Sequence, residues 1–434
     1  MKKERTFLHI DGDAFFAACT VALHPELVGK PVVTGLERGI VTAASYEAKA
    51  LGITRAMSLH QIRRDFPQVA IMESDYNAIT IFSKRMATIV KKYSPVVEEY
   101  SVDECFADLT NLYVSGKADP IEVAMKIQKE IGDELNISVS VGLGPTKVLA
   151  KLASNYNKPH GFTVFTAENR EEYLSSIEIG DVWGIGRRTA VFLKNVGVTN
   201  ALQFAQLTEE WIDATLSKPF VELWHEMRGN SLLKVHTRED ADAQKSISKT
   251  GTFTPPSRSP IYVFAELSKN IENACAKMRQ QGLRGKRAVI FVKRQDFKYH
   301  SIECVVPHAT NSPEAFIAIA KERFGELFKP GEDYRATGFT VYDLSPTSLQ
   351  KDLFGATETT DRFEKVHEAI DAIDHFFGKH TVHLGTTAKA LLPRTDLSKA
   401  GARKRDSENG FRSTTPGRVN FFDRFAIPFG GSVA

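Results

Sequence analysis

Two adjacent acids in a strand-like segment constrain most strongly how this chain can fold. Asp103 and Glu104 lie within the stretch VEEYSVDECFADLT, between apolar residues typical of strands. Neighbouring side chains of a regular strand face opposite sides, so one of the two acids should face the core. A buried carboxylate is costly unless it is paired, hydrogen-bonded or bound to metal. The segment therefore predicts a specific partner for these acids.

The segments around Asp103 and Glu104 predict a fold that brings these acids close to Asp11. We expect a strand at 6–10, a helix at 77–93, strands at 96–100 and 105–109, a helix at 121–131 and a strand at 137–144. This β-α-β-β-α-β order matches the ferredoxin-like split βαβ arrangement, with residues 21–75 inserted after the first strand. If the second and third strands form a hairpin, Asp103 and Glu104 lie at its bend and turn toward Asp11.

Three carboxylates at one edge of a sheet repel one another unless a cation lies between them. Magnesium suits such a site, because it is a hard cation bound by one or two carboxylates together with substrate phosphates. The simpler alternative is a helix cap or a surface hairpin whose acids are solvated. For Asp103 and Glu104 alone that alternative is favoured, but Asp11 at the end of a buried strand favours the metal site.

Length and composition set the broad class. A chain of 434 residues with 42% hydrophobic and 25% charged residues predicts a soluble protein of two to four domains. The apolar run near the N-terminus is interrupted by Asp11 and Asp13, which argues against a signal peptide. No apolar segment reaches the roughly 18 residues of a membrane span. Neither a zinc site nor a disulfide framework is expected, and a reducing cytoplasm fits best. The four cysteines lie far apart, at Cys19, Cys105, Cys275 and Cys304.

The net charge of +3 hides an asymmetry. Residues 245–300 contain twelve lysines and arginines against three acids, which gives +9 there and −6 elsewhere. Such a basic block predicts a surface for a nucleic-acid backbone. A solvated, lysine-rich surface without a partner is an equally good interpretation of the charge alone.

Seven sequence blocks resemble the Y-family translesion DNA polymerases, the DinB/UmuC superfamily. They follow one another in the family's order as far as about Gly197, and a weaker likeness continues to about Phe354. The blocks are HIDGDAFFAAC, LVGKPVV, TAASYEAKALGI, VEEYSVDECFADLT, SVGLGPTKVLAKLAS, NKPHGF and VWGIGRRTA.

The resemblance implies an α+β fold: a ferredoxin-like palm with a small fingers insert, a helical thumb with a helix-hairpin-helix, and a separate α/β little finger. The implied boundaries are 1–16 and 77–166 for the palm, 17–76 for the fingers, 167–237 for the thumb, 244–347 for the little finger, and 348–434 for a C-terminal region.

The resemblance also assigns the metal site. Asp11 and Asp103 would bridge two Mg²⁺ ions, Gly12 would offer its carbonyl to the nucleotide-side ion, and Glu104 would hold the catalytic one. One ion then activates the primer 3′-hydroxyl and the other neutralises the triphosphate. Asp13 has no ligand role in the family pattern, so we expect a structural acid there.

The nucleotide site follows from the same blocks. Phe16 falls at the steric-gate position, where a ring excludes a ribose 2′-hydroxyl. Phe15 beside it is counted with the nucleotide-binding residues and should also pack in the core. Tyr46, Lys49 and Lys158 match the residues that hold the triphosphate. Two positions depart from the DinB pattern, which often has Arg at Lys49 and Thr at Ala43, so the grip on the nucleotide should be weaker.

Two further segments are expected to hold DNA. In VWGIGRRTA, Gly184 and Gly186 allow a tight turn that directs free N–H groups of the next helix at a phosphate, with Arg187 and Arg188 adding charge. In the little finger we expect four strands, TGTFTP, RAVIFVKR, HSIECVVP and GFTVYDL, and helices near 264–280 and 312–328. Backbone contacts are expected from the basic residues Lys286, Arg287, Lys293 and Arg294.

The C-terminal region contains a candidate peptide motif. Gln350, Leu353 and Phe354 in SLQKDLFG resemble the pentapeptide that binds the bacterial sliding clamp; a linker that folds back is the alternative. A helix is expected at 361–377. Beyond Pro393 we expect disorder apart from FFDRFAIP, a candidate partner motif.

The predicted function is template-directed, low-fidelity DNA synthesis past lesions, without proofreading, on primer-template DNA with deoxynucleoside triphosphates. The small fingers insert has no long helix to close over the new base pair, which implies a loose pocket. A catalytically silent DNA-bound scaffold and a nucleotide cyclase are the rivals; the three acids count against the first, and the basic module against the second. The branch stays open: VEEYSVDE, AKALGI and VWGIGRR lean toward UmuC, the polymerase V catalytic subunit, and SYEAK and NKPHGF lean toward DinB. A UmuC-like enzyme would need a UmuD-like subunit and a recombinase filament. The implied setting is the bacterial cytoplasm, at the nucleoid, in the SOS response to DNA damage.

Overall fold

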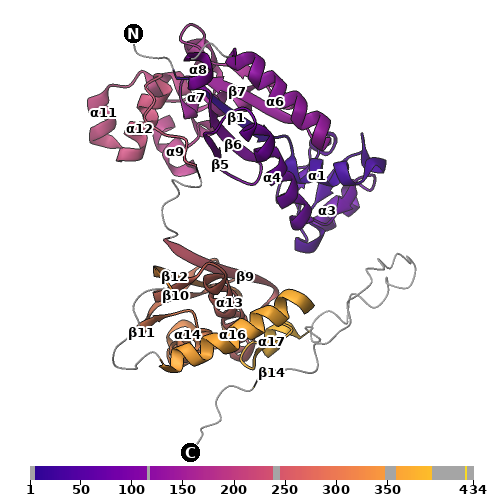
Figure 1. Cartoon of the computed structure of the whole chain (residues 1–434), viewed down its shortest axis with the longest axis vertical. Helices are drawn as coiled ribbons and strands as arrows, with labels where there is room; N and C mark the ends of the chain where they lie inside the picture. Colours follow the sequence, from indigo (N-terminus) through magenta and orange to yellow (C-terminus); the bar gives the residue numbers. More distant parts are fainter. Residues whose placement is uncertain (1–4, 115–117, 238–244, 348–357, 393–425, 428–434) are drawn as a thin grey trace, which may run out of the picture. The chain divides into compact units, whose positions relative to one another are not determined.

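The computed structural model describes residues 5–114, 118–237, 245–347, 358–392 and 426–427. The chain divides into two compact units, residues 1–241 and 242–434, which are described separately (Figure 1). Within these described ranges, no helix combines the length and apolar character needed to span a membrane. The four cysteines are buried and free.

Unit 1 is built on a five-stranded sheet in the order β5-β6-β1-β7-β8. The central strand β1 pairs antiparallel with both β6 and β7, which confirms the ferredoxin-like arrangement. The bend between β5 and β6 contains Asp103, as predicted, and Glu104 begins β6. The strands are β1 (Phe7–Gly12), β5 (Val97–Glu99), β6 (Glu104–Asp108), β7 (Val139–Gly144) and β8 (Phe162–Val164).

One face of this sheet packs against α1, α4 and α6 (Figure 1). Leu8, Ile10 and Cys105 project from that face and are almost fully buried. The helices are α1 (Phe15–Leu23), α4 (Tyr76–Lys91), α5 (Thr110–Val114) and α6 (Pro120–Leu135). Apolar residues recur at helical spacing in α4 and α6, so each buries one stripe against the strands.

The other face is covered by α7 (Lys147–Tyr156), which lies unusually close to β7. A Cβ added at Gly142 would lie 2.1 Å from the Ala150 carbonyl oxygen, so only glycine allows this approach. Strand alternation places Phe7, His9 and Asp11 on this second face. Asp11, the first of the three predicted acids, therefore lies on the face that α7 covers.

Between α1 and α4 the chain forms a small subdomain with its own core, which includes Val33, Leu59 and Ile62. Its sheet has the order β3-β2-β4. The predicted start of the fingers at residue 17 falls inside α1, whose Phe15 and Cys19 pack in the core of the large sheet. The elements are β2 (Val32–Thr34), β3 (Ala43–Ala44), β4 (Ala70–Met72), α2 (Tyr46–Ala50), α3 (Leu59–Asp65), and the 3₁₀ helices η1 (Pro25–Leu27) and η2 (Leu36–Arg38).

A helical subdomain completes unit 1 and has a core around Phe204, Leu193 and Trp224. Its elements are short, and several begin at a side-chain cap such as Thr208 or Asn200. They are α8 (Arg170–Ser176), η3 (Ile179–Asp181), α9 (Arg187–Asn195), α10 (Ala201–Ala205), α11 (Glu209–Thr215) and α12 (Lys218–Met227).

Unit 2 is built on a four-stranded antiparallel sheet in the order β11-β10-β12-β9. Helices cover one face; the helix predicted at 312–328 is two helices, which separate at Arg323. Its elements are β9 (Ser246–Ser257), β10 (Leu283–Arg294), β11 (Tyr299–Thr310), β12 (Tyr334–Pro346), α13 (Pro260–Gln280), α14 (Pro313–Glu322) and α15 (Phe324–Leu327). On the other face, alternate residues of β10 such as Arg287 and Lys293 point away from the helices.

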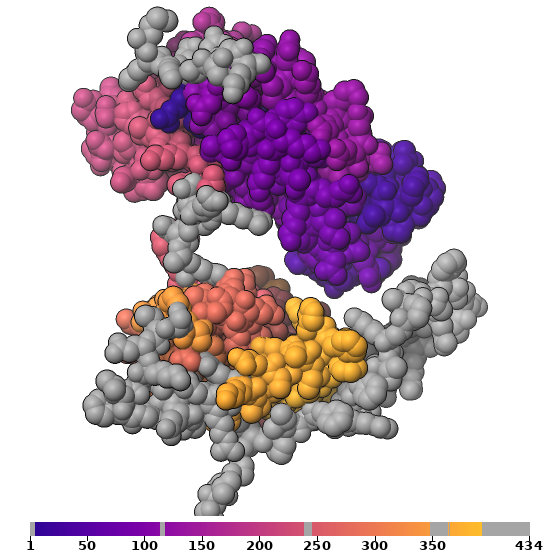
Figure 2. Space-filling model, viewed as in Figure 1, coloured from indigo at the N-terminus to yellow at the C-terminus, as the bar shows by residue number. Residues whose placement is uncertain are grey.

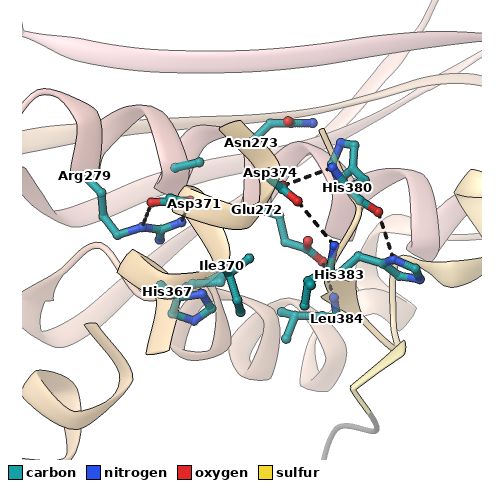
Figure 3. A pocket seen from close by; sticks show the side chains of 13 residues that line it. Glu272, Asn273, Arg279, His367, Ile370, Asp371, Asp374, His380, His383 and Leu384 are labelled. Atoms are coloured by element: carbon teal, nitrogen blue, oxygen red, sulfur yellow. Dashed lines mark hydrogen bonds and ion pairs between the residues drawn. The ribbon is translucent and has the colours of Figure 1, made fainter. Parts of the chain in front are cut away.

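The segment after the sheet lies on the helical layer of unit 2. Figure 2 shows α16 (orange to yellow) on the outer surface of that unit. Arg279 of α13 makes two hydrogen bonds to Asp371 (Figure 3). His367 contacts both carboxylate oxygens of Glu314. The elements are α16 (Glu358–Phe377), β13 (His383–Leu384), α17 (Ala388–Leu391) and β14 (Ala426–Ile427), which pairs with β13. The helix predicted at 361–377 begins slightly earlier.

Candidate active site

Asp11 and Glu104 face each other on paired strands. They are direct partners in the β1–β6 register, so their side chains project from the same face of the sheet. The next residue back, Asp103, accepts a hydrogen bond at its carbonyl oxygen from the Gly12 N–H, with 2.9 Å between nitrogen and oxygen. The fold thus brings the backbone of all three predicted acids to one end of β1.

Lysine ammonium groups hold two of these acids. Lys158 is paired with Asp11, and Lys151 Nζ lies 2.6 Å from Glu104 Oε2. The Asp103 carboxylate instead accepts a hydrogen bond from the Ser101 hydroxyl. Among the described residues, no three His, Cys, Asp or Glu side chains converge as a ready metal-binding group. The backbones therefore meet as predicted, whereas the carboxylate groups point to separate partners.

The electrostatics at Asp11 favour a cation. The pKa of Asp11 is raised to about 6, mainly by burial; the neighbouring Glu104 contributes to this rise, and Lys158 opposes it. Two carboxylates this close cannot both ionise without positive charge beside them. In the structure the two lysines supply that charge.

The residues present fit a hard divalent cation. The donors are carboxylate oxygens and one backbone carbonyl, the ligand set that magnesium prefers. The cationic partners already bound to Asp11 and Glu104 show that both acids accept a positive charge at this place. The donor chemistry therefore fits such a cation, at oxygens that now contact Lys151 and Lys158.

The sequence interpretation missed the charged residues of α7. Lys147 and Lys151 are only 4% and 7% exposed, although they lie on the helix that covers the sheet. Lys147 Nζ donates to Glu98 Oε2 at 2.7 Å and to the Lys234 carbonyl at 3.0 Å. The sequence did offer a sign of this arrangement. Lys147 and Lys151 are four residues apart in the otherwise apolar stretch KVLAKLAS, so they lie on the same face of the helix.

A buried histidine lies beside these lysines. His9 is fully buried, and its Nδ1 lies 2.7 Å from the Ser154 hydroxyl oxygen. Burial lowers the pKa of His9 well below its usual value, and the positive charges of Lys151, Lys158 and Lys147 add to that effect. The imidazole is therefore neutral, and the positive charge of this face resides on the lysines.

Two aromatic rings connect Lys151 to the helical subdomain. Its ammonium lies 5.0 Å from the Tyr100 ring centroid and 5.6 Å from that of Trp183. The Trp183 indole N–H donates to the Tyr100 hydroxyl at 3.2 Å. Lys151 thus touches Glu104 on one side and the segment just before α9 on the other.

The predicted nucleotide residues lie near the same acids. Tyr46 and Lys49 are on α2, with the Lys49 ammonium 4.0 Å from the centre of the Tyr46 ring. Burial, with Asp13 and Asp11 nearby, raises the pKa of Tyr46 to about 12. Burial also lowers the pKa of Lys49, and the charge of Lys158 lowers it further.

The two phenylalanines of α1 differ in burial. Phe15 is buried in the core, whereas Phe16 is half-buried and meets Tyr76 edge-on at 6.0 Å between ring centroids. Asp13 behaves as a structural acid: it accepts hydrogen bonds from the Ser140 hydroxyl and the His160 N–H, each at 2.8 Å.

The glycine turn of VWGIGRRTA leads into α9. Gly184 has a φ of 95°, which favours glycine, and Gly186 is the N-cap residue. Arg187 and Arg188 open the helix and are exposed. The first N–H groups of a helix have no partner within it, so this terminus can receive an anion.

The predicted basic residues of unit 2 differ in their surroundings. Lys286 and Arg287 are exposed, and Arg287 lies 2.7 Å from Glu303. Arg294 is paired with Glu332 and Asp296, and is therefore less available to a phosphate. Lys293 lies near two aromatic rings. The predicted clamp residues Gln350, Leu353 and Phe354 lie outside the described ranges.

A ferredoxin-like sheet with two acids opposed on its central strands defines a palm of the kind that hosts phosphoryl transfer. Comparison with known proteins gives the family. Residues 10–155 match the model of the impB/mucB/samB family, and residues 244–353 match the model of its C-terminal domain. The chain belongs to this family, the Y-family of DNA polymerases, as its motifs predicted.

Two relatives illustrate the match. DNA polymerase IV of Streptococcus pneumoniae serotype 2 strain D39 is 30% identical over 345 residues, which cover 78% of this chain and 96% of the relative. DNA polymerase IV of Desulfatibacillum aliphaticivorans is 30% identical over 411 residues, covering 92% and 100%. Neither name supports the UmuC branch, which stays a prediction.

Solved structures confirm the fold class. A Y-family DNA polymerase chimera, Dbh-Dpo4(243-245)-Dbh, superposes with a TM-score of 0.67 at 23% identity, covering 78% of this chain and 98% of the other. An insertion ternary complex of Dbh DNA polymerase superposes with a TM-score of 0.51 at the same identity and coverage.

Proposed function

We propose that this protein is a template-directed, low-fidelity DNA polymerase that copies damaged templates by nucleotidyl transfer to a primer 3′-hydroxyl. The observation that carries the proposal is the opposition of Asp11 and Glu104 across β1 and β6, with Asp103 joined to Gly12 beside them. Family membership supports the same reaction.

Asp11, Asp103, Glu104 and the Gly12 carbonyl would hold two Mg²⁺ ions. When bound, the ions supply activation of the primer hydroxyl and neutralisation of the triphosphate. The protein's own contribution is to keep Asp11 and Glu104 in register and to close their other side with α7, which excludes water and strengthens electrostatic interactions.

Three side chains would bind the triphosphate. Lys158, Lys49 and Tyr46 offer two ammonium groups and a phenol near Asp11. The ammonium charges and the phenol O–H would stabilise the negative charge that develops on the leaving group. Burial and the charge of Lys158 lower the pKa of Lys49, and an anionic phosphate bound beside it would stabilise its charged form.

Phe16 would select deoxyribose by colliding with a ribose 2′-hydroxyl. Phe16→Ala should raise ribonucleotide incorporation about tenfold or more, because it relieves a clash worth about 1.4 kcal/mol. Single-nucleotide incorporation with paired ribo- and deoxynucleotides measures the ratio, and Phe16→Tyr, which keeps the ring, is the matched control. An unchanged ratio in Phe16→Ala removes the assignment.

The remaining parts would hold the substrate. We assign 1–16 and 77–166 to the palm, 17–76 to the fingers, 167–237 to the thumb and 244–347 to the little finger. The α9 terminus and the basic residues of β10 would bind DNA phosphates in a sequence-independent way. A sliding clamp that binds Gln350, Leu353 and Phe354 in residues 348–355 would raise the local concentration of the enzyme at primer ends.

The deciding experiment is primer extension on undamaged and abasic templates with magnesium, with Asp103→Ala and Glu104→Ala as controls. Extension that both substitutions abolish supports the proposal. Firm primer-template binding without extension, even with a UmuD-like subunit and a recombinase filament, supports a DNA-bound scaffold instead.

A further inference from the structure

The turn between β10 and β11 exposes two aromatic rings. Phe297 is 59% exposed and Tyr299 is 57% exposed. Phe297 has a φ of 69°, a left-handed conformation that is strained for a bulky side chain. The short turn is closed by a hydrogen bond from the Arg294 N–H to the Lys298 carbonyl at 2.9 Å. Because Phe297 is exposed, core packing does not offset the free-energy cost of its strained backbone. Such an uncompensated strain suggests that the ring has a function.

Positive charges lie against these rings. The Lys293 ammonium is 4.9 Å from the centre of the Phe297 ring and 4.6 Å from that of Tyr299. The Arg335 guanidinium carbon is 4.4 Å from the Phe297 ring centre. No ion pair between described residues involves Lys293 or Arg335. The site therefore carries positive charge that no described carboxylate neutralises.

A third ring extends the surface across the sheet. Phe291 lies 5.3 Å from Tyr299 between ring centroids, on the face of the sheet away from the helices. A Cβ added at Gly338 would lie 2.2 Å from Phe291 Cε1, so the ring can lie over β12 only because residue 338 is glycine. Phe291, Phe297 and Tyr299 form what we term the aromatic platform.

We propose that the aromatic platform binds unpaired bases of single-stranded DNA by stacking, while Lys293 and Arg335 pair with the adjacent phosphates. The inference rests on the proposed function, because an enzyme that copies a template must handle its unpaired strand. Every base has a π face, so stacking on aromatic rings holds single strands without regard to sequence. An intact duplex presents phosphates and groove edges but no free base faces, and would gain little from exposed rings.

The test measures binding of the full-length protein, without metal or nucleotide, to a short single strand containing 2-aminopurine. A blunt duplex of the same length is measured in parallel. Phe297→Leu and Tyr299→Leu should weaken single-strand binding about tenfold and lose the fluorescence quenching that stacking causes. Phe297→Trp should keep both. Val305→Ala, which removes an apolar side chain 52% exposed on the same strand as Tyr299, is the matched control and should bind as the unchanged protein does.

Two further variants separate the contributions. Phe297→Gly relieves the left-handed strain, so it should unfold at a higher denaturant concentration and yet bind single strands more weakly. Arg335→Gln should make the salt dependence of single-strand binding less steep, with a slope change of about 0.7.

Quenching lost with Phe297→Leu but kept with Phe297→Trp supports the proposal. Equal binding by Phe297→Leu, Val305→Ala and the unchanged protein overturns it, as does an equal loss of duplex binding. Absence of primer extension, even with a UmuD-like subunit and a recombinase filament, would refute the proposed function, and the single-strand binding result would still decide this proposal.

Discussion

Each unit buries a group of opposite charges, but the acids have different partners. In unit 1, Asp11 and Glu104 are held by the ammonium groups of Lys158 and Lys151. In unit 2, Asp371 receives two parallel hydrogen bonds from Arg279, of 2.6 and 2.8 Å, in the layer between α13 and α16 (Figure 3).

The two kinds of partner differ in how easily another cation can replace them at the carboxylate. A lysine ammonium is a compact charge on a flexible stem, so another cation can replace it at the same oxygens. A guanidinium fork fixes a carboxylate in both position and orientation. In this protein the acids proposed to bind metal are paired with exchangeable lysine ammonium groups, whereas the acid that fastens α16 to α13 is held by the two-pronged guanidinium of Arg279.

Removing an acid of unit 1 should have the largest effect. Asp11→Ala and Glu104→Ala should each lower single-nucleotide incorporation about 10³-fold or more, because they remove charge stabilisation worth several kcal/mol in the transition state. Because Glu104→Ala also leaves the Lys151 ammonium, whose side chain is 9% exposed, without its carboxylate, circular dichroism of each variant must show native folding before the loss is assigned to the chemistry. Glu134→Ala, at an exposed acid of α6, is the control; a loss below tenfold in either variant would show that these acids are structural.

Removing the acid of unit 2 should destabilise the folded protein and should not act on catalysis directly. Asp371→Ala leaves Arg279, whose side chain is 9% exposed, as an unpaired buried charge and should cost about 3 kcal/mol in the free energy of unfolding. Urea unfolding followed by circular dichroism measures this cost. Glu326→Ala breaks an exposed pair with Arg323 and should cost less than about 1 kcal/mol. Equal costs in the two variants would contradict the burial argument.

Acidity should affect unit 2 through Glu272. Burial raises the pKa of Glu272 to about 7, and Glu314 and Asp374 nearby add to that effect although Thr387 and the Leu384 N–H oppose it. Because the folded pKa is raised above its ordinary value, the contribution of Glu272 to stability is complete below about pH 4.5 and is lost as the pH rises through 7.

Glu272→Gln should therefore unfold less readily than the unchanged protein at pH 8, by on the order of 2 kcal/mol, and lose this part of the pH dependence. Unfolding curves at several pH values test it. An exposed counterpart, Glu322→Gln on α14, should leave the pH profile as it is; a profile that Glu272→Gln does not alter would mean that the carboxyl is ionised throughout.

The smallest effect should come from removing the lysine that pairs with Glu104 in unit 1. Lys151→Met removes the ammonium that competes for Glu104, so the affinity for Mn²⁺ without DNA should rise about fivefold, or about 1 kcal/mol. Titration followed by electron paramagnetic resonance measures it. Lys147→Met is the matched control, because Lys147 pairs with Glu98 instead. Weaker Mn²⁺ binding by Lys151→Met would show that Lys151 organises Glu104 and does not compete for it.

The strand order and the meeting of Asp11, Asp103 and Glu104 were predictable, because strand alternation and helical periodicity are local patterns in the sequence. The partners of the acids were not, because Lys151 and Lys158 come from segments about 50 or more residues further along the chain. The separation of α14 from α15 at Arg323 was also missed, since apolar residues continue across it at helical spacing.

The close approach of α7 to β7 has a consequence for mutational tolerance. Gly142 bears no charge and would never be chosen as an active-site residue, yet any side chain there would meet the backbone of Ala150 and Ser154. The helix would have to shift as a body, and Lys151 would shift with it away from Glu104. Inactivating substitutions should therefore include positions whose only role is to be small, and a search confined to charged residues would overlook them.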